Sequence, residues 1–193
     1  MSARRTELNR IAARLFAERG YQGTSLADLA EQLGVQKPSL YHHIASKEDL
    51  LWAIVDRAAA AFELAADRAT DETGGADAVG RLAALVEAHV EVVTADPERS
   101  SVFVTEWRHL SGGRRAVIAG RRDAYERRVR DLIADGRAVG AFAPVDPALA
   151  ATFLLTALNG IATWYRPAGR LSADRVADQY VDLALRSLLE DHR

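Results

Sequence analysis

The stretch from residue 36 to residue 47 concentrates side chains that can bind a polyanion. Lys37 and Lys47 are the only lysines in the chain. Pro38 offers an apolar surface that suits a thymine methyl group, and the neighbouring polar groups can hydrogen-bond base edges or phosphate oxygens. We expect DNA contacts here from Gln36, Lys37, Pro38, Ser39, Tyr41, His42, His43 and Lys47.

Two earlier segments carry similar chemistry. Arg4 and Arg5 form a basic arm ahead of the first predicted helix. Thr24 and Ser25 precede the second predicted helix, where hydroxyls and free backbone N–H groups suit a phosphate. The alternative is that all of these residues form the solvated surface of a small helical domain.

A Glu-x-x-His pair, Glu106 and His109, has the spacing of a metal site on a helix. Di-iron bundles need two such pairs and two further glutamates, and His89 and Glu91 do not supply them at helical spacing. The chain has no Cys and no Gly-x-Ser-x-Gly nucleophile elbow. We therefore expect no catalytic residue, metal or cofactor, and a metal-dependent helical-bundle enzyme stays an alternative.

Arginine is dense between residues 99 and 130. This segment holds nine Arg against Glu106, Asp123 and Glu126, a net charge of +6 that leaves -8 for the rest of the chain. A positive segment within an acidic protein can attract phosphates or carboxylates. The alternative is a solvated, arginine-rich helix face.

Helical periodicity predicts the elements that position these side chains, and no stretch sustains strand alternation. Ser25 and Asp28 form a capping box for a helix at 26–33, which Gly34 ends. The apolar stripe of the first helix, at about 5–19, is Leu8, Ile11, Ala12, Leu15 and Phe16. Further helices are expected at about 37–44, 47–69, 78–94, 97–110, 114–137, 147–164 and 173–191, with a loop at 71–77.

Three short helices with a glycine-centred turn before the third describe a helix-turn-helix. Its second element, here about 37–44, enters the DNA major groove. One short helix contacts few bases, so we expect a dimer that places two of them about one DNA turn apart, ~34–36 Å.

The last two predicted helices can supply the dimer face. Residues 147–165 carry no charge, and the final helix has an apolar stripe. The alternatives are an intramolecular core and a membrane span, which needs about 20 strongly apolar residues. We expect a homodimer through these two helices, without membrane association. The N-terminus has no secretory signal, which predicts a cytoplasmic protein.

The composition fits this organisation. The chain has 193 residues, 49% hydrophobic and 27% charged, with a net charge of -2, which favours a soluble globular protein over a disordered one. We expect a helix-turn-helix DNA-binding domain at 1–47 and a helical ligand-binding and dimerisation domain at 48–193.

The stretch from Gly20 to Leu51 resembles the tetracycline-repressor (TetR) family of bacterial regulators. The matching pieces are Thr24-Ser25, Asp28-Leu29-Ala30, Gly34-Val35, Lys37, Leu40-Tyr41 and Ser46-Lys47-Glu48. Gln36 stands where the family often has Ser, and Ile44 where an aromatic is usual. The resemblance implies an all-α protein of nine to ten helices, a transcriptional repressor whose C-terminal domain dimerises. A small ligand bound there would release the double-stranded DNA operator.

Residues 106–110, 121–126 and 157–172 resemble the ligand domain of acyl-CoA-responsive TetR regulators, most specifically at Trp-Tyr-Arg-Pro-Ala-Gly-Arg-Leu-Ser from Trp164 to Ser172. This resemblance implies an acyl-CoA effector, with arginines at the CoA phosphates and aromatic residues around the acyl group. The expected effector site is Phe103, Trp107, Arg121, Arg122, Tyr125, Phe153, Asn159, Trp164, Arg166 and Arg170. A non-CoA or protein effector is the alternative.

Overall fold

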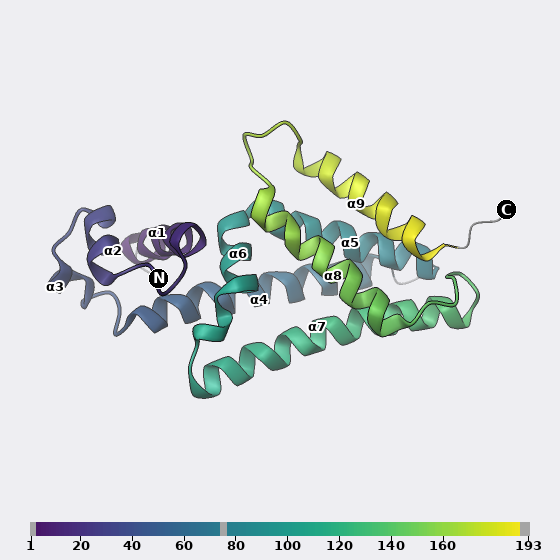
Figure 1. Ribbon diagram of the computed structural model, residues 1–193, viewed down its shortest axis with the longest axis horizontal. Coiled ribbons are helices and arrows are strands. Elements are labelled where there is room, and N and C mark those ends of the chain that lie inside the picture. The colour runs from purple at the N-terminus through teal and green to yellow at the C-terminus, as the bar shows by residue number, and fades with distance from the viewer. Residues whose placement is uncertain (1–2, 74–76, 190–193) are drawn as a thin grey trace. The chain divides into compact units, whose positions relative to one another are not determined.

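The computed structural model describes residues 3–73 and 77–189. Within these ranges every secondary-structure element is helical, which confirms the predicted all-α fold (Figure 1). The predicted loop residues Gly74 and Gly75 and the predicted end of the last helix lie outside the described residues. The elements are α1 (Ala3–Arg19), α2 (Leu26–Leu33), α3 (Lys37–Leu40), α4 (Lys47–Glu72), α5 (Ala78–Ala95), α6 (Pro97–Thr105), the 3-10 helix η1 (Trp107–His109), α7 (Gly112–Ala138), α8 (Pro147–Trp164) and α9 (Ala173–Leu188).

These helices form two compact units, and the long helices α4 and α7 contribute to both. The first unit comprises the chain up to Ala59 together with Glu98–Gly120. The second comprises Ala60–Pro97 and the chain from Arg121 onward. This division differs from the sequence-based domains at 1–47 and 48–193, because α6, η1 and the start of α7 pack with the N-terminal helices.

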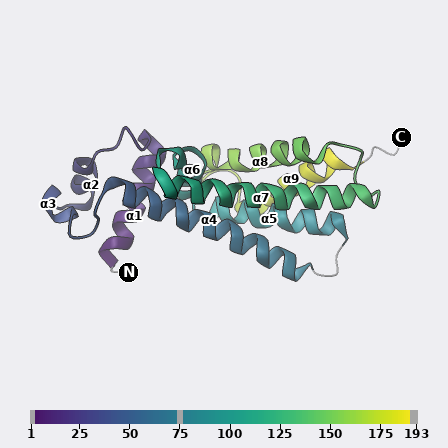
Figure 2. The same ribbon diagram turned by 90° about the horizontal axis from the view of Figure 1, so that it is seen from below.

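The apolar stripe of α1 builds the core of the first unit. All five of its predicted members are buried, none more than 3% exposed. Helix α1 packs on α2, and α2 packs on α3 (Figure 2). Leu40 and Ile44 are buried on either side of the turn that follows α3, so they anchor a helix only four residues long.

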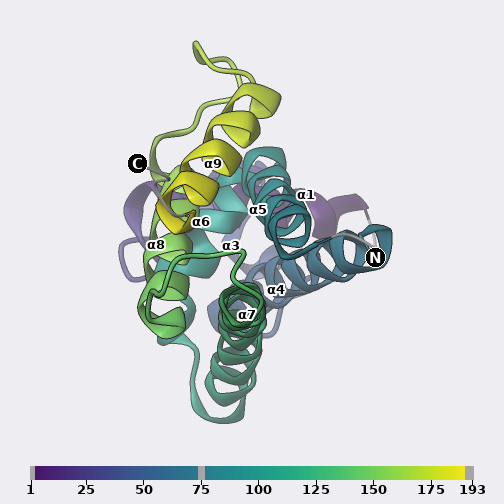
Figure 3. The same ribbon diagram turned by 90° about the vertical axis from the view of Figure 1, so that its right-hand side faces the viewer.

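In the second unit, α5 packs against both α8 and α9 (Figure 3). Leu82, Val86 and Val90 form its buried face. Asp146 caps α8 by accepting hydrogen bonds from the N–H groups of Ala148 and Leu149, and Pro147 starts the helix, as the sequence predicts.

Two predicted helices are shorter than expected. The third was predicted at about 37–44, but α3 ends at Leu40, because the N–H groups of His42 and His43 bond three residues back in tight turns. The helix predicted at 97–110 ends at Thr105 and continues as η1. There the Thr105 hydroxyl bonds the Glu106 carboxylate, which also accepts the N–H of Tyr21.

Helix α8 is, among the described helices, the one long and apolar enough to cross a membrane by length and composition. Only 28% of it is buried within the chain. Leu149 and Phe153 on α8 are 73% and 61% exposed. Among residues 3–73 and 77–189, no partner covers the exposed apolar face of α8.

Candidate DNA-binding surface and effector site

The predicted recognition segment presents its polar side chains to solvent. Lys37, Pro38, Tyr41 and His42 are exposed, and so is Gln36 before them. Ser39 and His43 are half-buried. Proline at the second helical position fixes the backbone at the start of α3, and Leu40 holds the other face in the core. Helix α3 therefore has one face in the core and the other exposed to solvent.

The start of α2 is organised by the predicted capping box. The Ser25 hydroxyl accepts the N–H of Asp28 at 3.2 Å, and the Asp28 carboxylate accepts the N–H of Ser25 at 2.7 Å. Hydrogen bonding to the Asp28 carboxylate, first by the Ser25 side chain and then by the Ser25 backbone N–H, lowers the pKa of Asp28. Ser25 itself stays exposed.

Thr24 does not face solvent as the sequence interpretation required. Its side chain is 1% exposed, and its hydroxyl donates to the backbone carbonyls of Leu15 and Gly20. The prediction of a DNA contact through this hydroxyl is therefore wrong. Thr24 ties the turn after α1 to the helix instead.

Lys47 has a structural role that the sequence did not indicate. Its ammonium group donates to the carbonyls of Tyr21 and Thr24, both at 2.8 Å, and lies 4.2 Å from the centre of the Tyr21 ring. Burial lowers the pKa of Lys47. This cation fastens the start of α4 to the turn between α1 and α2, so it is not a free phosphate ligand.

The two arginines of the basic arm, Arg4 and Arg5, also differ in whether their side chains face solvent. Arg4 is exposed, whereas the Arg5 guanidinium donates to the backbone carbonyl of His43. Arg5, His42 and His43 line a groove of about 580 Å³ together with Arg57 of α4. Arg57 is an exposed cation beside the recognition segment that sequence reasoning missed, because it is one arginine among many on a long helix.

The Glu106–His109 pair contacts the N-terminal helices rather than forming a metal centre. Glu106 accepts the N–H of Tyr21 at 2.9 Å, and the His109 ring stacks on the Tyr21 ring with centres 5.5 Å apart. Among the described residues, no group of three or more His, Cys, Asp or Glu side chains is placed to hold a metal ion. A turn later, Ser111 donates both its N–H and its hydroxyl to Glu48.

Three of the nine clustered arginines are paired with acidic residues of α4. In the second unit, Arg121 makes a two-pronged ion pair with Glu63 at 2.6 and 2.7 Å. Arg128 binds Asp67 at 2.6 Å. In the first unit, Arg114 binds Asp49 at 2.6 Å. These pairs join α7 to α4, an outcome that neither the ligand interpretation nor the solvated-face interpretation anticipated.

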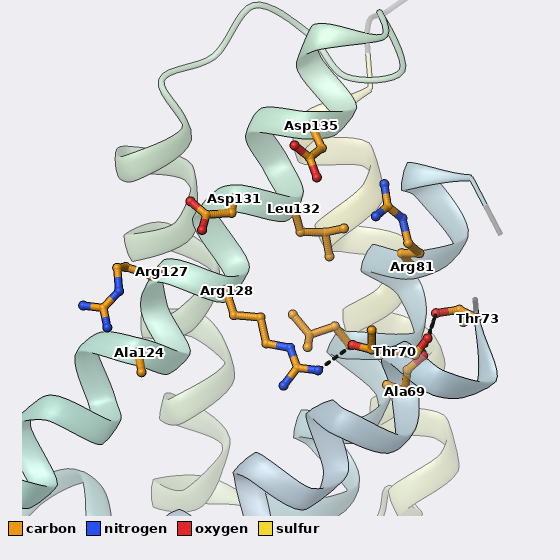
Figure 4. A pocket seen from close by; sticks show the side chains of 11 residues that line it. Ala69, Thr70, Thr73, Arg81, Ala124, Arg127, Arg128, Asp131, Leu132 and Asp135 are labelled. Atoms are coloured by element: carbon orange, nitrogen blue, oxygen red, sulfur yellow. Dashed lines mark hydrogen bonds between the residues drawn. The ribbon is translucent and has the colours of Figure 1, made fainter. Parts of the chain in front are cut away.

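A groove of about 430 Å³ lies between α4, α5 and α7 in the second unit (Figure 4). Figure 4 shows Arg128 extending from α7 toward Thr70, with which it hydrogen-bonds. The lining combines cations, carboxylates, hydroxyls and apolar side chains: Ala69, Thr70, Thr73, Arg81, Leu85, Ala124, Arg127, Arg128, Asp131, Leu132 and Asp135. The sequence interpretation placed none of these residues at the effector site.

Three aromatic rings meet inside the second unit, one each from α4, α5 and α7. His89 is 3% exposed, and its Nδ1 lies 3.0 Å from the Tyr125 hydroxyl. The Phe62 ring packs on the imidazole, with centres 4.7 Å apart. Burial lowers the pKa of His89 to about 3 and raises the pKa of Tyr125, so both groups are uncharged at neutral pH.

The other predicted effector residues are dispersed. Of all ten predicted effector residues, Phe103 and Trp107 belong to the first unit and the other eight to the second. On α8, Phe153 and Trp164 are exposed, and Trp164 stacks on Tyr180 of α9 with ring centres 6.4 Å apart. Asn159 and Arg122 are half-buried, and Arg166 and Arg170 are exposed after α8.

Comparison with known proteins matches both halves of the chain. Residues 10–54 match the family model "Bacterial regulatory proteins, tetR family", and residues 75–188 match the tetracyclin repressor-like C-terminal domain. The transcriptional repressor KstR2 of Rhodococcus jostii is 33% identical over 99% of this chain and 94% of that protein.

Solved structures agree in fold. KstR2 of Mycobacterium tuberculosis, described as a ketosteroid transcriptional regulator, superposes with a TM-score of 0.85 at 29% identity, covering 99% of this chain and 97% of that one. AibR, solved in complex with isovaleryl coenzyme A and operator DNA, superposes with a TM-score of 0.80 at 32% identity, covering 93% and 97%.

Regulators of this kind bind operator DNA as dimers and respond to a small-molecule effector, and they are not enzymes. The metal-enzyme alternative built on Glu106 and His109 is thereby set aside. With both its N-terminal and C-terminal segments matched, the chain belongs to the tetR family of bacterial regulatory proteins and is a ligand-responsive transcriptional repressor.

Proposed function

We propose that this repressor binds a palindromic operator as a homodimer in the bacterial cytoplasm and leaves it when an acyl-CoA thioester binds. The observation that carries the DNA part is the exposed outer face of α3, with Lys37, Pro38 and Tyr41 displayed around the buried anchor Leu40. In this reading Lys37 contacts a phosphate or a guanine edge, while Pro38 meets a thymine methyl group.

The dimer forms through α8 and α9. Leu149, Phe153 and Leu183 are each at least 60% exposed, which is costly for large apolar side chains in water. A second copy would cover both helices in a four-helix interface, the geometry that small residues on α8 such as Gly160 allow by close approach. This pairing gives the unburied face of α8 a partner without a membrane.

The CoA class of effector is supported by AibR, whose structure contains isovaleryl coenzyme A. Arg166 and Arg170 flank the turn after α8 and are exposed, so they are available to the phosphates of CoA. Arg121 is less suited than the sequence indicated, because its Nε and Nη2 groups already donate to Glu63.

The signal reaches DNA through α7 and the segment before it. Helix α7 contributes to both units, and its first turns are joined to α4 of the first unit by Arg114–Asp49 and Ser111–Glu48. Glu106 adds a bond to the turn before α2. An effector that moves the DNA-competent population from 99:1 to 1:99 must favour the released conformer by about 5.5 kcal/mol.

A gel-shift assay with an acyl-CoA panel tests this function. The operator fragment is selected from random duplexes, and the panel contains isovaleryl-CoA, octanoyl-CoA and the CoA ester of a steroid carboxylic acid, since one relative is described as a ketosteroid regulator. We expect at least one thioester to release DNA at concentrations where free CoA does not. Arg170→Ala should raise the concentration required about tenfold, the effect of one charge-assisted contact.

The control is Arg115→Ala, which removes an exposed arginine of α7 in the first unit. It should release at the parental concentration. If every thioester leaves the complex intact while DNA binding persists, the CoA class is wrong and a different effector must be sought. If no duplex is selected at all, the DNA-reading assignment fails.

A further inference from the structure

The Nε2 atom of His89 is buried and has no hydrogen-bond partner within the described residues. Native proteins rarely leave a buried donor or acceptor unpaired, because such a group has lost its hydrogen bonds to water. The imidazole stands in the interior of the second unit, on the helix α5 that packs against α8 and α9. This position is well suited to a ligand that supplies the missing partner.

The contact with Tyr125 indicates whether Nε2 of His89 is a hydrogen-bond donor or an acceptor. The Tyr125 hydroxyl lies 3.0 Å from Nδ1 of His89, and a phenol is a better donor than a neutral imidazole N–H. Tyr125 therefore donates to Nδ1, which places the imidazole proton on Nε2. Because both side chains are uncharged at neutral pH, a buried carboxylate would find no counter-charge on them, whereas a neutral carbonyl oxygen fits.

The three residues of this cluster share helix faces with the groove between α4, α5 and α7. Leu85, which lines the groove, precedes His89 by four residues, so both lie on one face of α5. Arg128 follows Tyr125 by three residues on α7, and Ala69 follows Phe62 by seven on α4. The groove and the cluster are thus consecutive layers between the same three helices.

We propose that His89 is a binding residue of the effector site, whose Nε2–H donates a hydrogen bond to the thioester carbonyl oxygen of the ligand. Tyr125 is a positioning residue that holds the imidazole in the donor tautomer, and Phe62 provides the apolar surface beside it. This inference rests on the proposed acyl-CoA effector and assigns the residue that recognises its acyl linkage.

The test compares two ligands that differ in one oxygen atom. Octanoyl-CoA carries the thioester carbonyl, and S-octyl-CoA is the thioether of the same chain length without it. Isothermal titration of the full-length protein should show octanoyl-CoA binding about tenfold more tightly, the value of one buried hydrogen bond. In His89→Leu the two ligands should bind within about twofold of each other, because the donor is gone.

The matched control is Thr94→Val, which removes a different buried polar group of α5, one whose hydroxyl bonds the carbonyl of Val90 in its own helix. It should keep the tenfold preference. His89→Gln, which retains an N–H donor, should keep part of it. A wild-type protein that binds both ligands equally, or a His89→Leu protein that keeps the full preference, overturns the assignment.

A spectroscopic measurement on the wild-type protein does not depend on how the variants fold. The chain contains five histidines, so selective ¹⁵N labelling gives a simple spectrum, in which His89 is identified by its absence in His89→Gln. Without ligand, the Nε2 chemical shift should be that of a protonated nitrogen. The resonance should shift with octanoyl-CoA and not with S-octyl-CoA. Tyr125→Phe should mix the two tautomers. An Nε2 atom that is unprotonated, or unmoved by the thioester, contradicts the proposal.

The failure of the effector class is distinguishable from the failure of this assignment. If neither CoA compound binds, the CoA proposal is wrong. The wild type and His89→Leu are then tested with androst-4-ene-3,17-dione, a neutral apolar ketone. Binding of that ketone by the wild type and its loss in His89→Leu would support the carbonyl contact. Absence of binding by all neutral carbonyl probes overturns both.

Discussion

At the scale of single residues, the polar side chains of this repressor separate into those that face outward and those that hold the fold. Lys37 and Tyr41 are exposed, whereas Lys47 and Thr24, close to them in sequence and type, donate to backbone carbonyls. Residue type alone does not distinguish these cases, because an ammonium or hydroxyl serves a phosphate and a carbonyl oxygen equally well.

Lys37→Ala should weaken operator binding and reduce its salt dependence. Loss of one phosphate contact lowers the slope of log affinity against log salt by about 0.9. Fluorescence anisotropy at several salt concentrations measures this slope, with Arg115→Ala as a control for an exposed cation of α7. Tyr41→Ala should weaken binding without the change in slope. Parental affinity in both the Lys37→Ala and Tyr41→Ala variants would refute the recognition-helix assignment.

His89 should make folding stability fall in mild acid. Its pKa in the folded protein is about 3, below the ordinary value of 6.5, so only the unfolded chain takes up its proton as pH drops below 6.5. The loss reaches about 2 kcal/mol at pH 5 and grows until pH approaches 3. Urea unfolding at pH 7.5 and 5.0 should show this extra loss in the wild type and its absence in His89→Leu.

The loss of unfolding free energy between pH 7.5 and 5.0 is compared between the wild type and His89→Leu. The carboxylates contribute equally to both proteins, so their effect cancels. His42→Gln, which removes an exposed imidazole, is the matched control and should retain the wild-type loss. An equal loss in His89→Leu and the wild type would mean that the imidazole is hydrated in solution.

At the scale of elements, local signals and tertiary contacts share the work. The capping box at Ser25 and Asp28 and the cap at Asp146 are readable from sequence and are present as predicted. The ends of α3 and α6 were not predicted: α3 ends in tight local turns, and at the end of α6 a contact from a distant residue takes part. The carboxylate of Glu106, bonded to Tyr21 some eighty-five residues earlier, is one such contact.

Gly34→Ala should destabilise the protein through the backbone alone. Gly34 has φ 70°, the left-handed conformation at the end of α2, and a Cβ there would meet no atom within 4 Å. The expected cost is about 1 kcal/mol, the penalty of this conformation for a residue with a side chain. Gly120→Ala is the opposite case, since Gly120 lies in α7 with open space around it, and should stabilise by about 0.5–1 kcal/mol. Urea denaturation measures the change in unfolding free energy for both variants. Equal changes would contradict the different backbone roles given to Gly34 and Gly120.

At the scale of the whole molecule, the proposed dimer explains why α8 is apolar on faces that its own chain leaves bare. Phe153→Glu should give a monomer in analytical ultracentrifugation and weaken operator binding at least tenfold, because two half-sites are no longer read together. Val139→Glu, at a site in the second unit that is 76% exposed and directly follows α7, should remain dimeric. A dimeric Phe153→Glu protein would move the interface elsewhere.

The sequence by itself determined the helices, their caps and the family. Hydrophobic periodicity, capping residues and the glycine turn depend only on residues that are close together in the sequence. It also predicted a DNA-reading surface around Lys37, a side chain that the structure shows to be exposed. Only the tertiary structure decided which cations are available: α4 supplies Glu63 and Asp67 to Arg121 and Arg128, a pairing between segments some sixty residues apart. It likewise brought His89 against Tyr125, and the burial that lowers the pKa of His89 exists only once three helices pack together.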